Sequence, residues 1–169
     1  VALRHDSTAV VWVQQRDDGR WHAKAKIWNP TPDGRLDVTD VMGVIRDLAS
    51  RFDVREVAFD PRFFDLPAQQ LLDEGYPMME IPQSLQRMTP AIGATFEALK
   101  RGEITHDADA AFTAHVLNAV PKMNETGFTL SKGKSRGKID AAVAMSIAYH
   151  RAQVKPDSVG AAAIWAVME

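Results

Sequence analysis

The segment from residue 56 to residue 81 constrains the fold more than any other part of the chain. Residues 56–59 form a short apolar run, residues 67–74 have a helical pattern that Gly75 ends, and residues 77–81 form a second apolar run. Two strands that are joined by a single helix in this way lie parallel in one sheet. The segment therefore predicts a parallel strand–helix–strand unit.

A hairpin precedes this unit. Residues 8–15 are rich in β-branched side chains, residues 21–28 alternate between apolar and polar side chains, and Asp18-Gly19 between them is a hairpin dipeptide. An antiparallel hairpin followed by parallel strands predicts an α/β fold with a mixed sheet. We expect flanking helices from Thr39 or Asp40 to about Arg51 and over residues 89–100, 107–120 and 139–152, and a loop or irregular hairpin over 122–137.

Composition sets the class of protein. With 169 residues, of which 46% are hydrophobic, the chain is long enough for one domain with a real core. The absence of cysteine excludes disulfides, thiolate zinc sites and cysteine nucleophiles. A net charge of −2 argues against nucleic-acid binding by bulk charge alone, so any such contact must come from a local basic patch. No apolar run is long enough for a membrane helix, and we expect one domain over 1–152 with a C-terminal tail over 153–169.

Asp60 is the first candidate for a chemical role. It directly follows the strand over 56–59, and ligands of open α/β sheets gather at the carboxyl ends of strands. The structural alternative is that Asp60, which precedes Pro61, accepts a turn hydrogen bond.

Asp140 is the second candidate, at the start of the helix over 139–152. An aspartate in a first helical turn is commonly a cap or a partner of the helix dipole. Here, however, no acidic residue lies between Glu125 and Asp140, and four basic residues come shortly before Asp140: Lys132, Lys134, Arg136 and Lys138. This basic loop is either a solvated segment or a phosphate-binding rim around an acidic centre.

An aspartate and three histidines are further candidate site residues, each of which also has an ordinary structural interpretation. Asp6 is a loop aspartate that could serve as a turn residue, and His5 and His106 could be ordinary hydrogen-bonded histidines. His115 and Asn118 share one helical face and could meet a common target.

Separated aspartates would act together if they bound metal. Two divalent ions about 4 Å apart activate a water molecule and stabilise the leaving oxygen of a phosphodiester. Mg²⁺ and Mn²⁺ favour oxygen ligands, so aspartate is the natural residue type. The chain has no phosphate-binding loop motif, dinucleotide fingerprint, Gly-x-Ser-x-Gly elbow or His-Glu-x-x-His motif, so we expect no ATP hydrolysis by this chain.

The chain carries an ordered set of short motifs: Val57 to Pro61, Gly75, Pro82-Gln83, Thr89-Pro90, Phe96 to Leu99, Gly102 to His106, His115 to Asn118 and Lys138 to Ala144. Their order and spacing resemble the C-terminal nuclease domain of the large terminase subunit of tailed bacteriophages. The resemblance runs from about Asp6 to Arg151.

The resemblance implies a ribonuclease H-like fold and a two-metal endonuclease that cuts concatemeric double-stranded viral DNA during packaging. Asp60 matches the family's fourth-strand acid and Asp140 its helix acid, and these acids hold two Mg²⁺ or Mn²⁺ ions. The basic loop would then hold the DNA backbone. Implied partners are double-stranded DNA, an upstream ATPase domain, the portal protein and the small terminase subunit, in the cytoplasm of the infected bacterium, with no membrane and no secretion.

The chain departs from the family pattern at its first acid. In the family this acid lies on the first strand, which would fall just before Val1, and Asp6 lies where some members carry an additional acid. We expect a strand to be missing upstream, and the alternative is that Asp6 substitutes as a catalytic and metal-binding residue. Two other hypotheses stay open: a different ribonuclease H-like nuclease, such as a resolvase or transposase-like enzyme, or a silent docking module for the portal or small terminase, suggested by the apolar end around Ile164, Trp165 and Val167.

Overall fold

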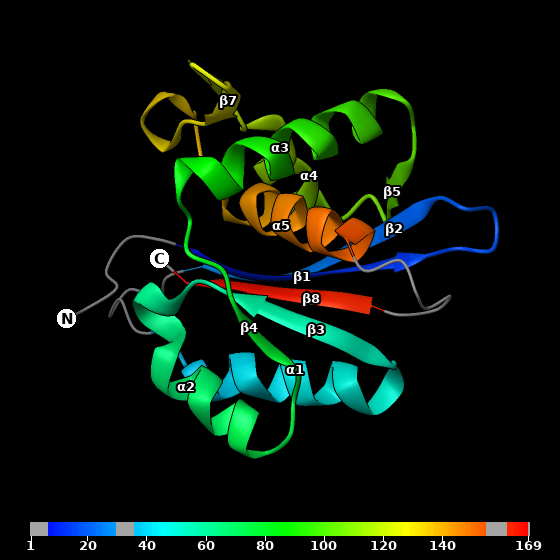
Figure 1. The fold of residues 1–169 in the computed structure, drawn as a ribbon, viewed down its shortest axis with the longest axis vertical. Helices are drawn as coiled ribbons and strands as arrows, with labels where there is room; N and C mark the ends of the chain where they lie inside the picture. The colour runs from blue at the N-terminus through cyan, green and yellow to red at the C-terminus, as the bar shows by residue number, and fades with distance from the viewer. Residues whose placement is uncertain (1–6, 30–35, 155–161, 169) are drawn as a thin grey trace.

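The computed structural model describes residues 7–29, 36–154 and 162–168, and these residues form a sheet between two layers of helices (Figure 1). The sheet has the strand order β4-β3-β8-β1-β2-β5. Its strands are β1 (Thr8–Gln15), β2 (Trp21–Trp28), β3 (Val54–Phe59), β4 (Met78–Glu80), β5 (Ile104–His106) and β8 (Ala162–Met168).

Helices cover both faces of the sheet. One layer contains α1 (Val38–Arg51) and α2 (Pro61–Asp73), and the opposite layer contains α3 (Leu85–Lys100), α4 (Ala110–Leu117) and α5 (Asp140–Val154). A small hairpin, β6 (Pro121–Asn124) with β7 (Gly127–Leu130), packs beside α3, and a 3₁₀ turn (Lys132–Lys134) follows it. None of the helices in the described ranges is long and apolar enough to cross a membrane.

The predicted mixed sheet is confirmed. β1 and β2 pair antiparallel around a turn in which Gly19 has a φ of +81°, a conformation that glycine adopts without steric cost. β3 and β4 pair parallel, as a strand–helix–strand unit requires.

β1 is buried on both faces, which identifies it as a central strand. Val10 packs in the cluster beneath α1 and α2, whereas Val11 and Val13 pack in the cluster beneath α3 and α5. Small side chains at the start of α5, Ala141 and Ala144 among them, are buried in this second cluster.

Several predicted helix starts were wrong. α2 begins at Pro61 and α3 at Leu85, so Pro67 and Pro90, which we took as first helical residues, lie inside their helices. Proline is tolerated in a first turn, and this preference misleads when the true cap lies upstream. α1 is capped by Asp37, whose side chain accepts a hydrogen bond from the Thr39 backbone at 2.9 Å.

Residues 162–168 differ most from the expectation of a tail. They form β8, which pairs antiparallel with β1 and parallel with β3. The side chains along β1 between Ala9 and Val13 are largely buried, so β1 needs a hydrogen-bonded neighbour on each side. This pairing joins segments about 150 residues apart, so local sequence patterns do not predict it. The boundary between residues 152 and 153 stays a prediction.

Candidate functional site

Asp60 lies where β3 ends and α2 begins. Its side chain is the N-cap of α2, with Oδ1 accepting a hydrogen bond from the Arg62 backbone nitrogen at 3.0 Å. The residue is only 7% exposed, and no described group donates to its second oxygen. From the sequence, Asp60 could be either a turn residue or a ligand. In the structure one oxygen of Asp60 accepts the cap hydrogen bond, and no described residue donates to the other.

Asp140 is the first residue of α5 and is almost fully buried, with 1% of its side chain exposed. Ser7, just before β1, donates its hydroxyl proton to Oδ2, and the Lys132 ammonium lies 3.2 Å from Oδ1. A buried carboxylate is costly unless it is paired and hydrogen-bonded, and both of these conditions are met here.

The sheet register brings both aspartates to one edge. Ala166 in β8 is aligned with Phe59 in β3 on one side and with Val10 in β1 on the other. The end of β3, which carries Asp60, and the start of β1, beside Ser7 and Asp140, are therefore two strand spacings apart, roughly 10 Å. Asp60 and Asp140 share this edge, and no hydrogen bond joins them.

The sequence pair of His115 and Asn118 does meet a common target, which is the segment that leads into α5. His115 Nδ1 accepts a hydrogen bond from the Ala141 backbone nitrogen at 3.1 Å. A Cβ added at Gly137 would lie 2.5 Å from the Asn118 side-chain nitrogen, so this loop and Asn118 are in close approach. His115 in α4 therefore contacts the first turn of α5, and Asn118, the C-cap of α4, packs against the loop that precedes it.

The electrostatics of His115 support this positioning role. Burial lowers its pKa, the Asp140 carboxylate acts in the opposite direction, and the Lys138 ammonium lowers it further. A neutral imidazole can accept at Nδ1, as the hydrogen bond from Ala141 requires. The lowered pKa of His115 favours its neutral form, which accepts the hydrogen bond from the Ala141 backbone next to Asp140.

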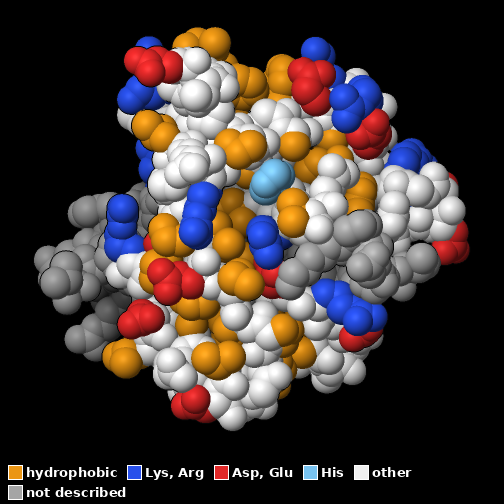
Figure 2. Space-filling model, viewed as in Figure 1, with side chains coloured by type: hydrophobic (Ala, Val, Ile, Leu, Met, Phe, Trp, Pro, Cys, Tyr) orange, Lys and Arg blue, Asp and Glu red, His pale blue; other side chains and the backbone are white. Residues whose placement is uncertain are grey.

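The basic loop lies beside Asp140. Together with Asp140, the residues Lys132, Arg136 and Lys138 line a cavity of about 320 Å³. Lys132, Lys134 and Arg136 are exposed and Lys138 is half-buried. Acidic and basic side chains are interspersed on the face of the molecule seen in Figure 2, so the basic loop is a local feature.

Two residues of this edge were not predicted from the sequence. Ser7 belongs to the site through its hydrogen bond to Asp140, and the two residues are 133 positions apart. Gln83 lines a cavity of about 630 Å³ with Asp60, Asp65 and Glu80, and its buried Nε2 has no hydrogen-bond partner within the described ranges. The one available signal was the Pro82-Gln83 pair in the family resemblance.

Other candidates lie elsewhere or outside the described residues. Asp6 and His5 fall outside the residues that the structure describes. His106 accepts a hydrogen bond from the Ala108 backbone and packs edge-on against Phe112, which is a local structural role.

The donor set fits a hard divalent cation. Mg²⁺ is commonly held by one or two carboxylates together with water molecules, and Asp60 and Asp140 supply two buried carboxylates. Within the described ranges, no three His, Cys, Asp or Glu side chains gather at one point. Asp60 and Asp140 are therefore two buried carboxylates of the ligand type that Mg²⁺ prefers, at one end of the sheet.

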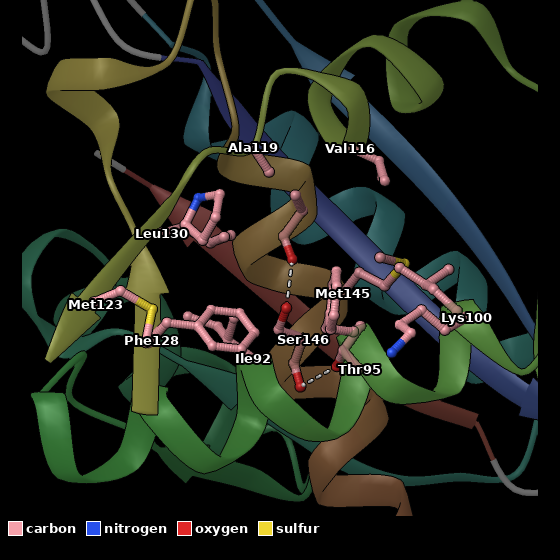
Figure 3. Close-up of a pocket in the computed structure, with 14 residues that line it drawn as sticks. Ile92, Thr95, Lys100, Val116, Ala119, Met123, Phe128, Leu130, Met145 and Ser146 are labelled. Carbon is pink, nitrogen blue, oxygen red and sulfur yellow. Dashed lines mark hydrogen bonds between the residues drawn. The ribbon is translucent and has the colours of Figure 1, made fainter. Parts of the chain in front are cut away.

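A further cavity on the α3–α5 side is mainly apolar. This cavity of about 450 Å³ is lined mainly by apolar side chains such as Ile92, Phe128 and Met145 (Figure 3). The Thr95 and Ser146 hydroxyls donate to carbonyls one turn earlier in their own helices, at 2.9 Å in each case. The cavity therefore offers no carboxylate and no free hydroxyl proton for catalysis.

A mixed sheet between two helical layers, with aspartates at the end of a parallel strand and at the start of a covering helix, defines a ribonuclease H-like α/β domain. The family model "Terminase large subunit, endonuclease domain" matches residues 4–155. The chain belongs to this family.

Individual relatives agree with this assignment. The large terminase subunit of Enterobacteria phage HK97 is 25% identical over 176 residues, which cover 87% of this chain and 35% of that protein. The crystal structure of the HK97 large terminase superposes with a TM-score of 0.76 at 26% identity, covering 85% of this chain and 36% of that one. The chain thus spans about a third of the length of the HK97 relative.

Structures from the thermophilic phage G20c share the fold. The large terminase nuclease of G20c has a TM-score of 0.66 at 17% identity, covering 87% of this chain and 76% of that chain. A second structure of that nuclease, with bound magnesium, has a TM-score of 0.65 at 17% identity and covers 88% and 76%.

Proposed function

We propose that this domain is a metal-dependent endonuclease that cuts concatemeric double-stranded viral DNA during genome packaging. The observation that carries the proposal is the Asp60 carboxylate, which is buried at the end of β3, at the same edge as Asp140, with one oxygen to which none of the described residues donates. Family membership and the magnesium bound by the G20c nuclease support this proposal.

Asp60 and Asp140 would hold Mg²⁺ or Mn²⁺, two ions in all, with Asp6 as a further ligand. When bound, such ions activate water and stabilise charge on the leaving oxygen of a phosphodiester. The chain's own residues prepare the edge: the cap hydrogen bond fixes the orientation of Asp60, and the neutral His115 fixes the first turn of α5 behind Asp140.

The basic loop would hold DNA. Lys132, Arg136 and Lys138 line a cavity with Asp140, and together with Lys134 of the same loop they would contact the phosphates that flank the bond to be cut. Phosphate contacts carry no base information, so cutting would be largely independent of sequence. The binding would weaken steeply with salt.

The remaining assignments follow from family membership. We propose that the domain works with an upstream ATPase domain, the portal protein and the small terminase subunit, in the cytoplasm of the infected bacterium. The docking-module hypothesis loses the observation that suggested it, because residues 162–168 form a strand in the middle of the sheet.

Plasmid cleavage in Mn²⁺ tests the proposal. Asp60→Asn should abolish cutting, whereas Asp65→Asn, which changes an exposed carboxylate on the same cavity, should leave it intact. Four-way junctions should be cut no better than linear duplex, and a strong junction preference would favour a resolvase instead.

A form extended upstream by the length of one strand should be tested beside the 169-residue chain. Cutting by the extended form alone would show that the first acid lies upstream. Cutting by both forms would favour Asp6 as a ligand. Failure of both forms in Mn²⁺ and in Mg²⁺ would refute the proposal.

A further inference from the structure

The buried carboxylate of Asp140 already carries a cation that belongs to the protein. Lys132 Nζ lies 3.2 Å from Oδ1, while Ser7 satisfies Oδ2. The Asp140 side chain is 1% exposed and the Lys132 side chain is 41% exposed. The ammonium group thus neutralises a buried charge from the solvent side, which is the side from which a metal ion or DNA would approach.

An ammonium group and a divalent cation cannot share one carboxylate oxygen without strong repulsion. A metal ion that binds Asp140 at Oδ1 must therefore displace the Lys132 ammonium. The 3₁₀ turn that carries Lys132 is exposed, and its side chain ends beside the other cations of the basic loop. A displaced ammonium would remain at the surface where a phosphate would lie.

We propose that Lys132 is a resident counter-ion that occupies the cation position of Asp140 and moves to a DNA phosphate when metal binds. This inference rests on the nuclease function proposed above. Because the two equilibria share one ammonium group, DNA that takes up Lys132 strengthens metal binding, and metal strengthens DNA binding by the same factor. Lys132 is in this sense a positioning residue that acts through Asp140.

Manganese binding without DNA isolates the first half of the proposal. Free Mn²⁺ is measured by electron paramagnetic resonance during titration of the wild-type chain, Lys132→Met and Lys134→Met. Lys134 lies in the same turn and forms no ion pair with a described residue, so it controls for the loss of one positive charge. We expect Lys132→Met to bind Mn²⁺ about tenfold more tightly and Lys134→Met to stay within about twofold of wild type.

Lys132→Gln keeps a hydrogen-bond donor for Asp140 and serves if the methionine variant folds poorly. It should also bind Mn²⁺ more tightly than wild type. If Lys132 had a merely structural role, both variants would melt earlier while Mn²⁺ affinity stayed the same or fell, and this result would overturn the inference.

DNA binding in EDTA tests the second half. With Lys132 held on Asp140, Lys132→Met should weaken duplex binding less than Lys134→Met does, and a larger loss for Lys132→Met would overturn the exchange. If wild type cuts DNA but Lys132→Met has unchanged Mn²⁺ affinity, the inference alone fails. If no variant binds Mn²⁺ and wild type does not cut, the proposed function fails and the inference with it.

Discussion

A buried ion pair joins the two elements that carry the candidate aspartates. Arg151, near the end of α5, donates to both oxygens of Glu56 in β3 at 2.6 and 2.7 Å. Glu56 is 4% exposed, and its carboxylate raises the pKa of Arg151. The pair ties β3, which ends at Asp60, to α5, which begins at Asp140.

Arg151→Met should destabilise the domain strongly because it leaves the Glu56 carboxylate buried without its guanidinium. Breaking a buried pair from one side costs about 3–5 kcal/mol. In a domain of this size each kcal/mol shifts the melting temperature by about 2–4 °C, so we expect a fall of about 6–20 °C. Thermal unfolding at pH 7, followed by circular dichroism, measures this shift.

The double variant Glu56→Gln/Arg151→Met distinguishes the loss of the guanidinium charge beside Glu56 from a loss of packing. It removes the buried charge together with its partner, so it should regain most of the lost stability. A single-variant loss below about 1 kcal/mol would refute this account, because exposed pairs are worth that little. A double variant no more stable than Arg151→Met would show that the arginine stem, and not the charge, contributes the stability.

Two other features of the α5 start give smaller effects. The pKa of His115 is lowered in the fold, so its contribution to stability is fully present above about pH 6.5 and is lost as pH falls below that value. His115→Asn keeps an acceptor for the Ala141 backbone and should flatten the dependence of melting temperature on pH between 5 and 6.5. Some dependence should remain, because burial also lowers the pKa of His150. An unchanged slope would contradict the role of His115. Gly137→Ala places a Cβ 2.5 Å from the Asn118 amide and should cost about 1–3 kcal/mol in chemical denaturation, and a cost near zero would show that the Asn118 side chain moves aside freely.

Local signals allowed much of the fold to be predicted. The Asp18-Gly19 dipeptide placed the hairpin, and Gly75, with a φ of +94°, ended the helix that precedes β4. Asp60 was found because strand ends are read directly from an apolar run followed by an Asp-Pro pair. Each of these features depends on residues that are neighbours in the sequence.

What the sequence did not predict depends on pairs far apart in the chain. One neighbour of β1 is β8, and one partner of Glu56 is Arg151, 95 residues away. A strand pattern indicates that a segment will be paired, and a buried glutamate indicates that it needs a cation. Neither pattern specifies which segment or which cation, because the choice is made by packing in three dimensions.

The two candidate aspartates differ in how the fold depends on them. One oxygen of Asp60 accepts the local cap hydrogen bond, a contact worth about 1 kcal/mol, and no described residue donates to the other. Asp140 is held by Ser7 and Lys132 from distant parts of the chain, while His115 fixes the helix turn behind it. A carboxylate whose charge is compensated by the protein itself is stable without metal, so the edge can form before any ion binds. If the proposed metal ion bound Asp140, this compensation would have to be undone, and the fold would thereby link the stability of the metal-free domain to its affinity for the ion.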